Sequence, residues 1–186
     1  MVANPGSDGY CGNMFEQLTI IHWPDPRLRK ISIPVTVFDE RLRRLATRML
    51  ELMKQAKGVG LAAPQVGINE RLFVMNHTGK PEDDRVVVNP VLTASDGEEE
   101  AEEGCLSLPE INIPVLRSRT LHLKAQDLTG AFFEQTETGY IPRIWQHEND
   151  HLDGILLLDK MSPVQKMTNR KHIREMEEAY QKIVRI

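Results

Sequence analysis

The sequence predicts an α+β fold with a single domain. Three observations support this: an amphipathic helical segment lies in the first third of the chain, strand-like segments follow it, and two helical segments close the chain. Strands and helices that lack a regular strand–helix–strand alternation are typical of α+β proteins. The 186 residues, 40% of them hydrophobic and 27% charged, suit one domain with a sizeable core.

Residues 1–16 are rich in Gly, Pro, Asn and Ser and contain few apolar side chains. We therefore expect a mobile N-terminal extension there, with Cys11 as an idle thiol, and one folded domain over residues 17–186. The start lacks the basic stretch and apolar run of a secretory signal, and no apolar run reaches the roughly 18 residues that span a bilayer. These features predict a cytoplasmic protein without a membrane partner.

The charge balance excludes a general attraction for nucleic acid. Lys and Arg number 23 against 27 acidic residues, so the net charge is −4. We expect no sequence-specific nucleic-acid partner, and a transient contact with the ribosome would need a local patch. The acidic run at residues 98–103 is expected to be a solvated loop or an edge strand.

The first predicted helix covers residues 39–57. Asp39 is a candidate N-cap and Gly58 a candidate stop. Apolar residues recur at helical spacing, so the stripe that they form is expected to face the core: Leu42, Leu45, Met49, Leu52, Met53 and Ala56.

Strand patterns begin after residue 71. Residues 72–75 and 86–88 are short apolar runs bounded by turn residues. Later, Leu121, Leu123 and Ala125 alternate with polar neighbours, and residues 127–130 form a turn signal before residues 131–137. This pattern predicts an antiparallel hairpin.

Two helices are expected near the end of the chain. The first begins near Pro142, which a first helical turn tolerates, and ends at Asp153, followed by Gly154 as the left-handed cap. The second covers residues 163–184. Its inner side is expected to carry Val164, Met167, Ile173, Met176, Tyr180 and Ile183.

The first of these two helices contains the pattern H-E-x-x-H. His147 and His151 are four residues apart, so both imidazoles lie on one helix face and can share a metal ion, with Glu148 beside them. Two surface histidines flanked by acids are also common without a metal. The pattern therefore needs a third ligand.

Three sources of a third ligand can be compared. A metzincin would have a histidine at position 157, which is Leu157 here. A thermolysin-like protease would take a glutamate from the last helix, for which Glu175 is a candidate. The third source is the thiolate of Cys105, although a lone cysteine is often only a small buried hydrophobe.

A further stretch adds to the pattern. GVGLAAPQ at residues 58–65 follows the first helix, EGCLS occupies residues 103–107, and QHENDH occupies residues 146–151. In this order the three stretches resemble the motifs of peptide deformylases, and the likeness extends from about residue 21 to residue 161. The resemblance implies antiparallel strands around a central H-E-x-x-H helix in a single catalytic domain.

The resemblance also implies the roles of the site residues. Cys105, His147 and His151 would hold one divalent metal, with water in the fourth position. Glu148 would take the proton of that water and pass it to the leaving amine. The side-chain amide of Gln65 and the backbone N–H of Leu106 would stabilise the negative charge of the tetrahedral intermediate.

The implied substrate is the N-formylmethionine of a nascent polypeptide, and the product is formate. The peptide would lie as an extra strand, and its binding residues would be Val59, Gly60, Gly104, Tyr140 and Ile144. A thiolate ligand suits Fe(II) or Zn(II) better than magnesium or calcium. With the resemblance, we expect Fe(II) as the native ion, while Zn(II), Ni(II) and Co(II) suit the same ligands.

Some features depart from the family pattern. Pro142 stands where the family usually has a small helix residue, and Arg143 follows it, so the pocket wall is expected to differ. Glu103 and Arg117 are expected to pair and to hold the cysteine loop. Two rival functions remain open at this point: a thermolysin-like protease that uses Glu175, and a catalytically idle homologue that binds formyl peptides or the ribosome.

Overall fold

The structure, a computed structural model, describes residues 15–184. Residues 1–14 of the expected extension, Cys11 among them, lie outside the described residues. Phe15, which the sequence pattern assigns to the extension, is instead buried against the core. The elements, in chain order, are η1 (Pro26–Arg29), α1 (Glu40–Gln55), β1 (Gly60–Ala62), η2 (Ala63–Val66), β2 (Leu72–Met75), η3 (Pro81–Asp83), β3 (Arg85–Cys105), β4 (Leu108–Gln126), β5 (Phe132–Thr138), α2 (Tyr140–Leu152), α3 (Leu157–Lys160) and α4 (Pro163–Val184).

The strands form one antiparallel sheet in the order β1-β2-β3-β4-β5. Helices flank it on several sides, which confirms the α+β prediction. The predicted hairpin is β4 and β5, joined by a turn in which the Asp127 side chain accepts hydrogen bonds from the backbone of Thr129 and Ala131. Short side chains of this kind stabilise tight turns.

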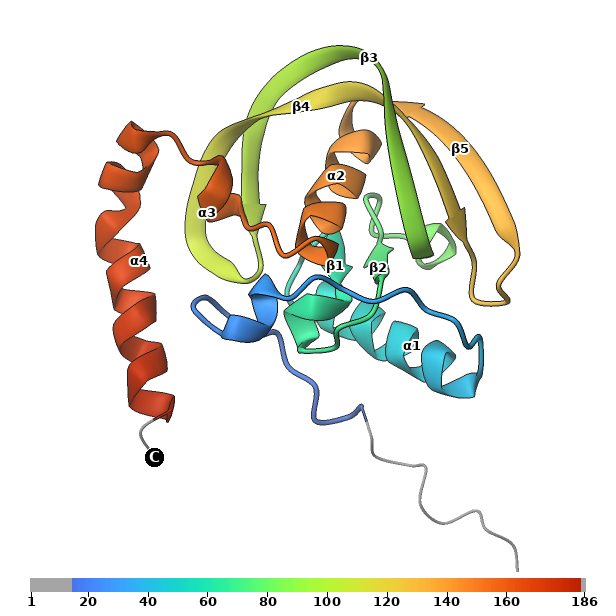
Figure 1. Ribbon diagram of the computed structural model, residues 1–186, viewed down its shortest axis with the longest axis horizontal. Coiled ribbons are helices and arrows are strands. Elements are labelled where there is room, and N and C mark those ends of the chain that lie inside the picture. Colours follow the sequence, from blue (N-terminus) through green and yellow to red (C-terminus); the bar gives the residue numbers. More distant parts are fainter. Residues whose placement is uncertain (1–14, 185–186) are drawn as a thin grey trace, which may run out of the picture.

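The strands β3 and β4 form a long bent hairpin that arches over α2 (Figure 1). The pairing between them shifts register near Val88, near Ala94 and at Cys105. Such irregularities increase the local twist of a strand, so they allow the hairpin to curve around the helix. Only the first residues of β3, 85–88, pair with β2. The acidic run at residues 98–103 therefore lies in an edge strand, paired on one side with β4.

The helix α1 buries the predicted stripe from Leu42 to Met53, but Ala56, its last predicted member, is exposed because it lies beyond the end of the helix. The Asp39 side chain accepts a hydrogen bond from the backbone N–H of Leu42, as an N-cap does, and the helix packs its buried face against β1 and β2. The helix ends at Gln55, and Lys57 rather than Gly58 adopts a left-handed φ of 56°. The helix end was therefore predicted two residues too late, and the left-handed residue one residue too late.

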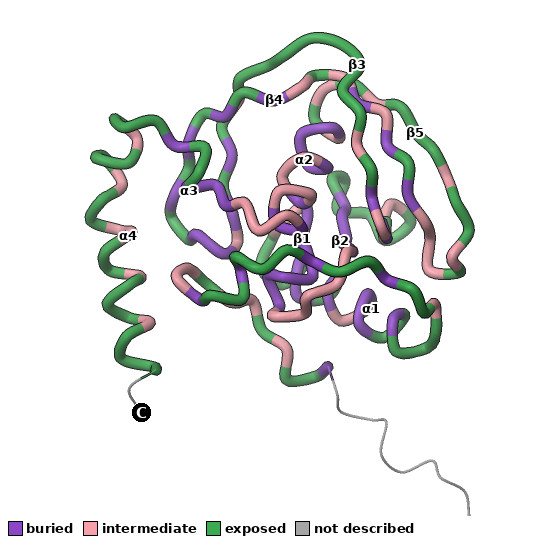
Figure 2. The backbone as a smooth tube through the Cα atoms, in the orientation of Figure 1, coloured by how far each residue is buried: buried purple, intermediate pink, exposed green. Residues whose placement is uncertain are grey.

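The helix α2 lies at the centre of the molecule, where buried segments surround it (Figure 2). It begins at Tyr140, two residues before Pro142, and Gly154 follows its end with φ 71°. A Cβ at Gly154 would lie 2.6 Å from the carbonyl oxygen of Arg29, so only glycine fits there.

The helix α4 has the predicted bounds, but only half of its predicted inner face is confirmed. Val164, Met167 and Ile183 are 68%, 73% and 72% exposed. Only Ile173 and Met176 pack against a buried cluster, because most of α4 stands to one side of the sheet (Figure 1). Within residues 15–184, no helix is long and apolar enough to cross a membrane.

Candidate metal centre and substrate cleft

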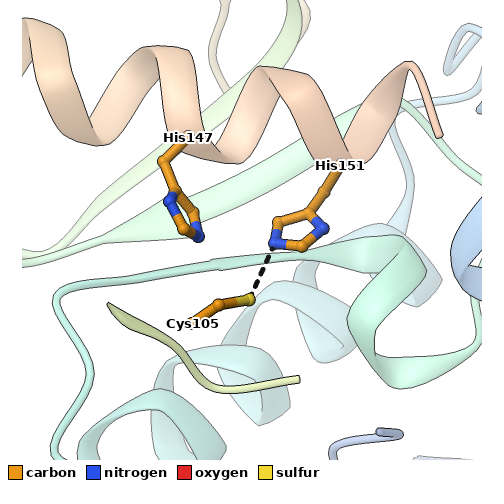
Figure 3. A group of neighbouring side chains, drawn as sticks. All are labelled: Cys105, His147 and His151. Atoms are coloured by element: carbon orange, nitrogen blue, oxygen red, sulfur yellow. Dashed lines mark hydrogen bonds between the residues drawn. The ribbon is translucent and has the colours of Figure 1, made fainter. Parts of the chain in front are cut away.

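The side chains of Cys105, His147 and His151 converge on one point (Figure 3). One ligand atom from each lies within 4.8 Å of the others, and the Cys105 Sγ is 3.3 Å from the His151 Nε2. Cys105 comes from the last residue of β3 and the histidines from α2, so residues 46 positions apart in the sequence meet here. Sulfur and imidazole nitrogen in this arrangement are ligands of zinc and of first-row transition metals.

Local structure explains how each ligand is presented. The β3–β4 connection is tight, because Cys105 pairs with Leu108 after a register shift at Gly104. The backbone carbonyl of Ser107 accepts a hydrogen bond from the N–H of Trp23, which ties this turn to the N-terminal segment. On α2 the two histidines occupy successive turns of one face.

The residue before the first histidine anchors the helix. The Gln146 side chain accepts a hydrogen bond from the backbone N–H of Ser118 and donates one to its carbonyl oxygen, at 3.0 and 2.9 Å. This paired contact fixes α2 against β4 immediately beside His147. The sequence motif contained Gln146, but its role becomes visible only with the sheet in place.

The carboxyl group of Glu148 is buried beside the ligands. Its Oε2 has no hydrogen-bond partner among residues 15–184, and burial raises the pKa of this carboxyl to about 7. The approach of Glu148 to β1 requires a glycine, because a Cβ at Gly60 would lie 2.3 Å from the Glu148 Oε1. An unpaired carboxyl with a pKa near neutrality is suited to proton transfer.

The amide of Gln65 is held in a fixed orientation. Its oxygen accepts a hydrogen bond from the backbone N–H of Ala62 at 2.8 Å, so its nitrogen faces the ligand cysteine. That nitrogen lies 3.2 Å from the Ser107 Oγ and 3.6 Å from the Cys105 Sγ. The conformation of the turn η2 places Gln65 within this reach, and its side chain is 1% exposed.

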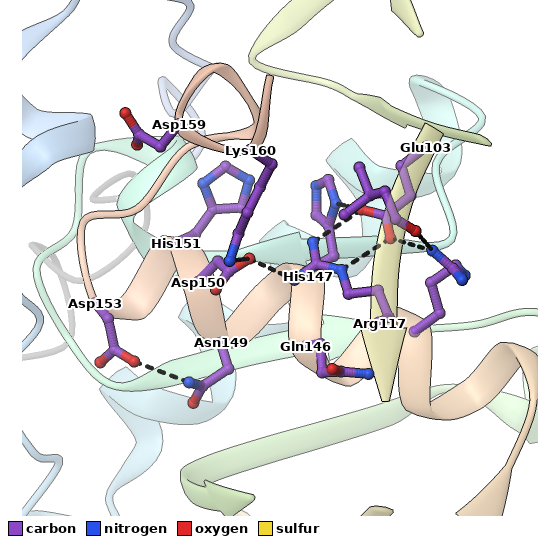
Figure 4. A network of polar contacts seen from close by, with 12 residues as sticks. Glu103, Arg117, Gln146, His147, Asn149, Asp150, His151, Asp153, Asp159 and Lys160 are labelled. Atoms are coloured by element: carbon purple, nitrogen blue, oxygen red, sulfur yellow. Dashed lines mark hydrogen bonds and ion pairs between the residues drawn. The ribbon is translucent and has the colours of Figure 1, made fainter. Parts of the chain in front are cut away.

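A network of buried charges supports His147 (Figure 4). The Glu103 carboxylate lies 3.0 Å from the His147 Nδ1, and Arg117 donates to both of its oxygens, at 2.9 and 2.8 Å. Arg117 also donates to Asp150 at 2.5 Å. Burial opposes ionisation of Glu103, but these hydrogen bonds outweigh it and lower the pKa of the carboxyl. The expected pairing of Glu103 with Arg117 is confirmed.

The two histidines differ in their surroundings. Burial lowers the pKa of His151, and charge on His147 adds to this effect. Burial acts in the same direction on His147, but contacts with Cys105 and Glu103 outweigh it and raise the pKa of that ring. A metal ion competes with a proton for a ring nitrogen, so a metal ion bound by these histidines would displace protons.

A cleft of about 460 Å³ leads to the three ligands. Val59, Gly60, Gly104, Tyr140 and Ile144, the residues expected to bind substrate, all line it. Glu148, Gln65 and Leu106 line it as well. One side of the cleft is the end of β3, and the other is the segment that enters β1.

The sequence of this chain is similar to those of known proteins. The sequence profile described as polypeptide deformylase matches residues 17–167. The chain belongs to the peptide deformylase family. The peptide deformylase of Thermotoga maritima is 46% identical over 153 residues, which cover 82% of this chain and 92% of that protein. The peptide deformylase of Acidobacterium capsulatum is 42% identical over 162 residues, covering 86% and 95%.

Solved structures of peptide deformylases share the fold. A plant peptide deformylase, PDF1B, superposes with a TM-score of 0.86 at 36% identity and covers 91% of this chain and 94% of that chain. The peptide deformylase of Legionella pneumophila gives 0.82 at 41% identity, covering 88% and 97%. Antiparallel strands around the central helix α2, as the resemblance implied, are therefore confirmed.

Two residues of the deformylase cleft were not predicted as site residues. Arg143 was noted only as a departure, yet its guanidinium is buried beside Glu103. Glu110 lines the mouth of the cleft and lies 3.7 Å from His172 of α4. Neither contact follows from sequence spacing, because each joins segments that only the sheet brings together.

The rival third ligand is not near the metal centre. Glu175 lies on α4, where its carboxylate is within 4 Å of Lys171 and His172 and its side chain is 54% exposed. The group that converges in the described part of the chain is Cys105 with the two histidines. The geometry therefore gives no support to a thermolysin-like protease.

Proposed function

We propose that this member of the family removes the N-formyl group from the initiator methionine of newly synthesised polypeptides and releases formate. The observation that carries the proposal is the meeting of Cys105, His147 and His151 beside the unpaired carboxyl of Glu148, at the end of a cleft. Family membership gives the reaction, and these residues give the means to perform it.

The residues fit a divalent metal ion. The donors are one sulfur and two imidazole nitrogens, which leaves a coordination position for water or substrate, as in catalytic rather than structural zinc sites. When bound, such an ion lowers the pKa of its water and polarises a carbonyl oxygen. A thiolate ligand suits Fe(II), Zn(II), Ni(II) or Co(II) better than magnesium or calcium. Among these ions we propose Fe(II) as the native one, with the others as replacements.

Glu148 is proposed to be the general base and then the general acid. Its buried carboxyl can accept the proton of the attacking water and return it to the nitrogen of the leaving amine. Its raised pKa supports this role, because a group with a pKa near the working pH both takes and gives a proton readily. Such transfer typically contributes roughly 10²- to 10⁴-fold to the rate.

Gln65 and Leu106 are proposed to stabilise the oxygen of the tetrahedral intermediate. The amide nitrogen of Gln65 is already directed toward the metal centre by the bond from Ala62 to its oxygen. A donor fixed in advance does not have to reorient as charge develops. The backbone N–H of Leu106, adjacent to the ligand cysteine, would be the second donor.

The substrate is proposed to bind as an added strand between Gly60 and Gly104. Near Gly104, β3 pairs only with β4 among the described residues, so its other edge faces the cleft. Main-chain bonds at such an edge tolerate varied sequences. Val59, Ile144 and Tyr140 would form the pocket for the methionine side chain.

The wider assignments are also proposals. Residues 17–186 are proposed to form one catalytic domain, which the family match over residues 17–167 supports. Formylated chains emerge from ribosomes in the cytoplasm, so we propose that compartment and a transient ribosome contact.

The test is formate release from formyl-Met-Ala-Ser by anaerobically prepared, Fe(II)-loaded protein. We expect the wild type to be active, Glu148→Ala to bind metal but to lose at least 10²-fold in kcat, and Cys105→Ser to lose metal affinity. Anaerobic handling is needed because a thiolate site is prone to oxidation. Metal-loaded wild-type protein that binds the peptide without releasing formate would instead identify a catalytically idle binding protein.

A further inference from the structure

Arg143 is a buried arginine on the ligand face of α2, one turn before His147. It is 6% exposed, although an arginine is almost never buried without partners. Its Nη1 donates to the Glu103 Oε1 at 2.8 Å and to the carbonyl oxygen of Val115 at 2.9 Å. Its Nη2 donates to the carbonyl oxygen of Glu99 at 2.6 Å. The side chain thus joins α2 to both strands of the long hairpin.

Through these contacts Arg143 is linked to the proposed metal ligand His147 by a single intervening side chain, that of Glu103. The Glu103 Oε1 accepts from Arg143, and the Oε2 of the same carboxylate lies 3.0 Å from the His147 Nδ1. The planar guanidinium of Arg143 fixes the directions of its bonds, from Nη1 to Glu103 and from Nη2 to the backbone of β3, which the point charge of a lysine does not do. The carbonyls of Val115 and Glu99 belong to the sheet, so they hold the guanidinium itself in a fixed place.

Arg117 alone does not fix the carboxylate in the same way. It reaches both oxygens of Glu103, but it also donates to Asp150, whose carboxylate lies 3.3 Å from the Lys160 Nζ. The charge of Arg117 is thus shared with a second acid. Arg143 donates to one carboxylate, Glu103, and otherwise to backbone oxygens.

We propose that Arg143 is a positioning residue for the metal centre: it anchors Glu103 to the β3–β4 hairpin and thereby sets the ring of His147 in its ligand orientation. This inference rests on the metal site proposed above. Groups that orient a ligand histidine from outside the coordination sphere typically contribute 10- to 100-fold in metal affinity. Arg143 would act indirectly on His147, through the Glu103 carboxylate.

The test measures metal affinity rather than turnover. Co(II) is titrated into metal-free protein in competition with a chromophoric chelator, and its visible spectrum is recorded. We expect Arg143→Met, which keeps the length and the helix propensity of the side chain, to weaken Co(II) binding at least 10-fold and to change the Co(II) absorption bands. Arg143→Lys keeps the charge but not the forked geometry, so its affinity should lie between those of Arg143→Met and the wild type.

Arg71→Met is the matched control. Arg71 is also a partly buried arginine that anchors α2, since it donates to Asp153 at 2.6 Å and to Asn149 at 3.2 Å, but it does not touch Glu103. We expect it to lower the melting temperature while the Co(II) dissociation constant stays within about twofold of the wild type. If Arg71→Met weakens Co(II) binding as much as Arg143→Met does, then any loss of anchoring of α2 weakens the site. That result would overturn a specific role for Arg143.

A double-mutant cycle with Glu103→Gln locates the effect. If Arg143 acts through this carboxylate, Arg143→Met should change Co(II) affinity by less than about threefold once Glu103 has been replaced. Unchanged affinity in both Arg143 variants, or equal losses with and without Glu103, would overturn the proposal. If Arg143→Met fails to fold, Arg143→Lys in the same cycle decides the question. A wild type that binds no Co(II) would contradict the metal site itself.

Discussion

At the scale of single residues, the site depends on close approaches that leave little freedom. Glu148 is buried, one of its oxygens has no partner in the described part of the chain, and its carboxyl occupies the space that a Cβ at Gly60 would need. Gln65 is fixed by one bond to Ala62, and its amide nitrogen therefore has one direction available. The chemistry of the site thus depends on which small residues surround the reactive groups as well as on the groups themselves.

Replacement of Gly60 by alanine should disable Glu148, the proposed base. The added methyl would lie 2.3 Å from the Glu148 Oε1 and 2.8 Å from its Cδ, so either the carboxyl or β1 must shift. A misplacement of about 1 Å can lower a rate roughly 10²-fold, and we expect a loss of that order in kcat. Gly58→Ala is the comparison and should lower kcat less. Its methyl would lie 2.7 Å from the Leu106 Cδ1, the end of a flexible side chain that can move aside. Equal activity of Gly60→Ala and wild type would contradict the placement of Glu148.

The raised pKa of Glu148 predicts a pH-dependent stability in metal-free protein. Its carboxyl titrates at about 7 when folded and at 4.5 in the reference state, so the folded state binds the extra proton between these values. Stability from this group is present below pH 4.5 and is lost as the pH rises through 7. Relative to the wild type, Glu148→Gln should gain nothing at pH 4 and roughly 3 kcal/mol above pH 8, measured by urea unfolding. A gain that is independent of pH would contradict this assignment.

At the scale of elements, the H-E-x-x-H helix and the long hairpin form the site together. The helix α2 brings His147, Glu148 and His151, while the hairpin brings Cys105 and Glu103. Gln146 and Arg143 connect the two elements through backbone atoms of both strands. By contrast, α4 contributes few buried contacts, and the family match ends at residue 167, near its start.

Removal of α4 should therefore leave the chemistry intact. A chain that ends at Ser162 loses the partly buried contacts of Ile173 and Met176 and the bond from Gln165 to the carbonyl of Pro114. We expect a loss of roughly 2 kcal/mol in unfolding free energy, with kcat/KM within a few fold of the full chain. Circular dichroism and formate release provide the measurements. A metal-loaded, folded truncation without activity would show that α4 takes part in the site.

At the scale of the whole molecule, a bound metal would cross-link distant parts of the chain. Its ligands come from the end of a strand and from a helix 42 to 46 residues later, and Glu103, Arg117 and Asp150 join the same two regions. The unfolded chain cannot preserve this ligand set. Metal binding therefore favours the folded state.

Metal removal should lower the melting temperature of the wild type. With metal at 100 times its dissociation constant, binding adds about 2.7 kcal/mol to stability. Chelation should remove that increment, and readdition of Co(II) or Zn(II) should restore it. Cys105→Ser should show a smaller change, since it lacks the thiolate. Calorimetry with and without chelator measures this, and identical shifts in the two proteins would exclude Cys105 as a ligand.

The sequence by itself determined the fold class, the helix α1 with its cap, the β4–β5 hairpin and the ligand candidates. These follow from local chemistry: periodicity, capping residues, turn residues and two histidines on one helix face. Spacing along the chain does not say whether Cys105 or Glu175 reaches the histidines of α2, and only the family resemblance favoured Cys105. The tertiary structure decided between the two residues, because it brings Cys105 to His147 and His151.

The tertiary structure also decided which apolar and charged residues are buried. The stripe on α4 has helical periodicity, yet Val164, Met167 and Ile183 are exposed because the sheet does not extend to them. Arginine is rarely buried. Arg143 is buried because the carbonyl oxygens of two strands and the Glu103 carboxylate accept its hydrogen bonds. The periodicity of apolar residues predicts which side of a helix is apolar, whereas the neighbouring strands determine whether that side is buried.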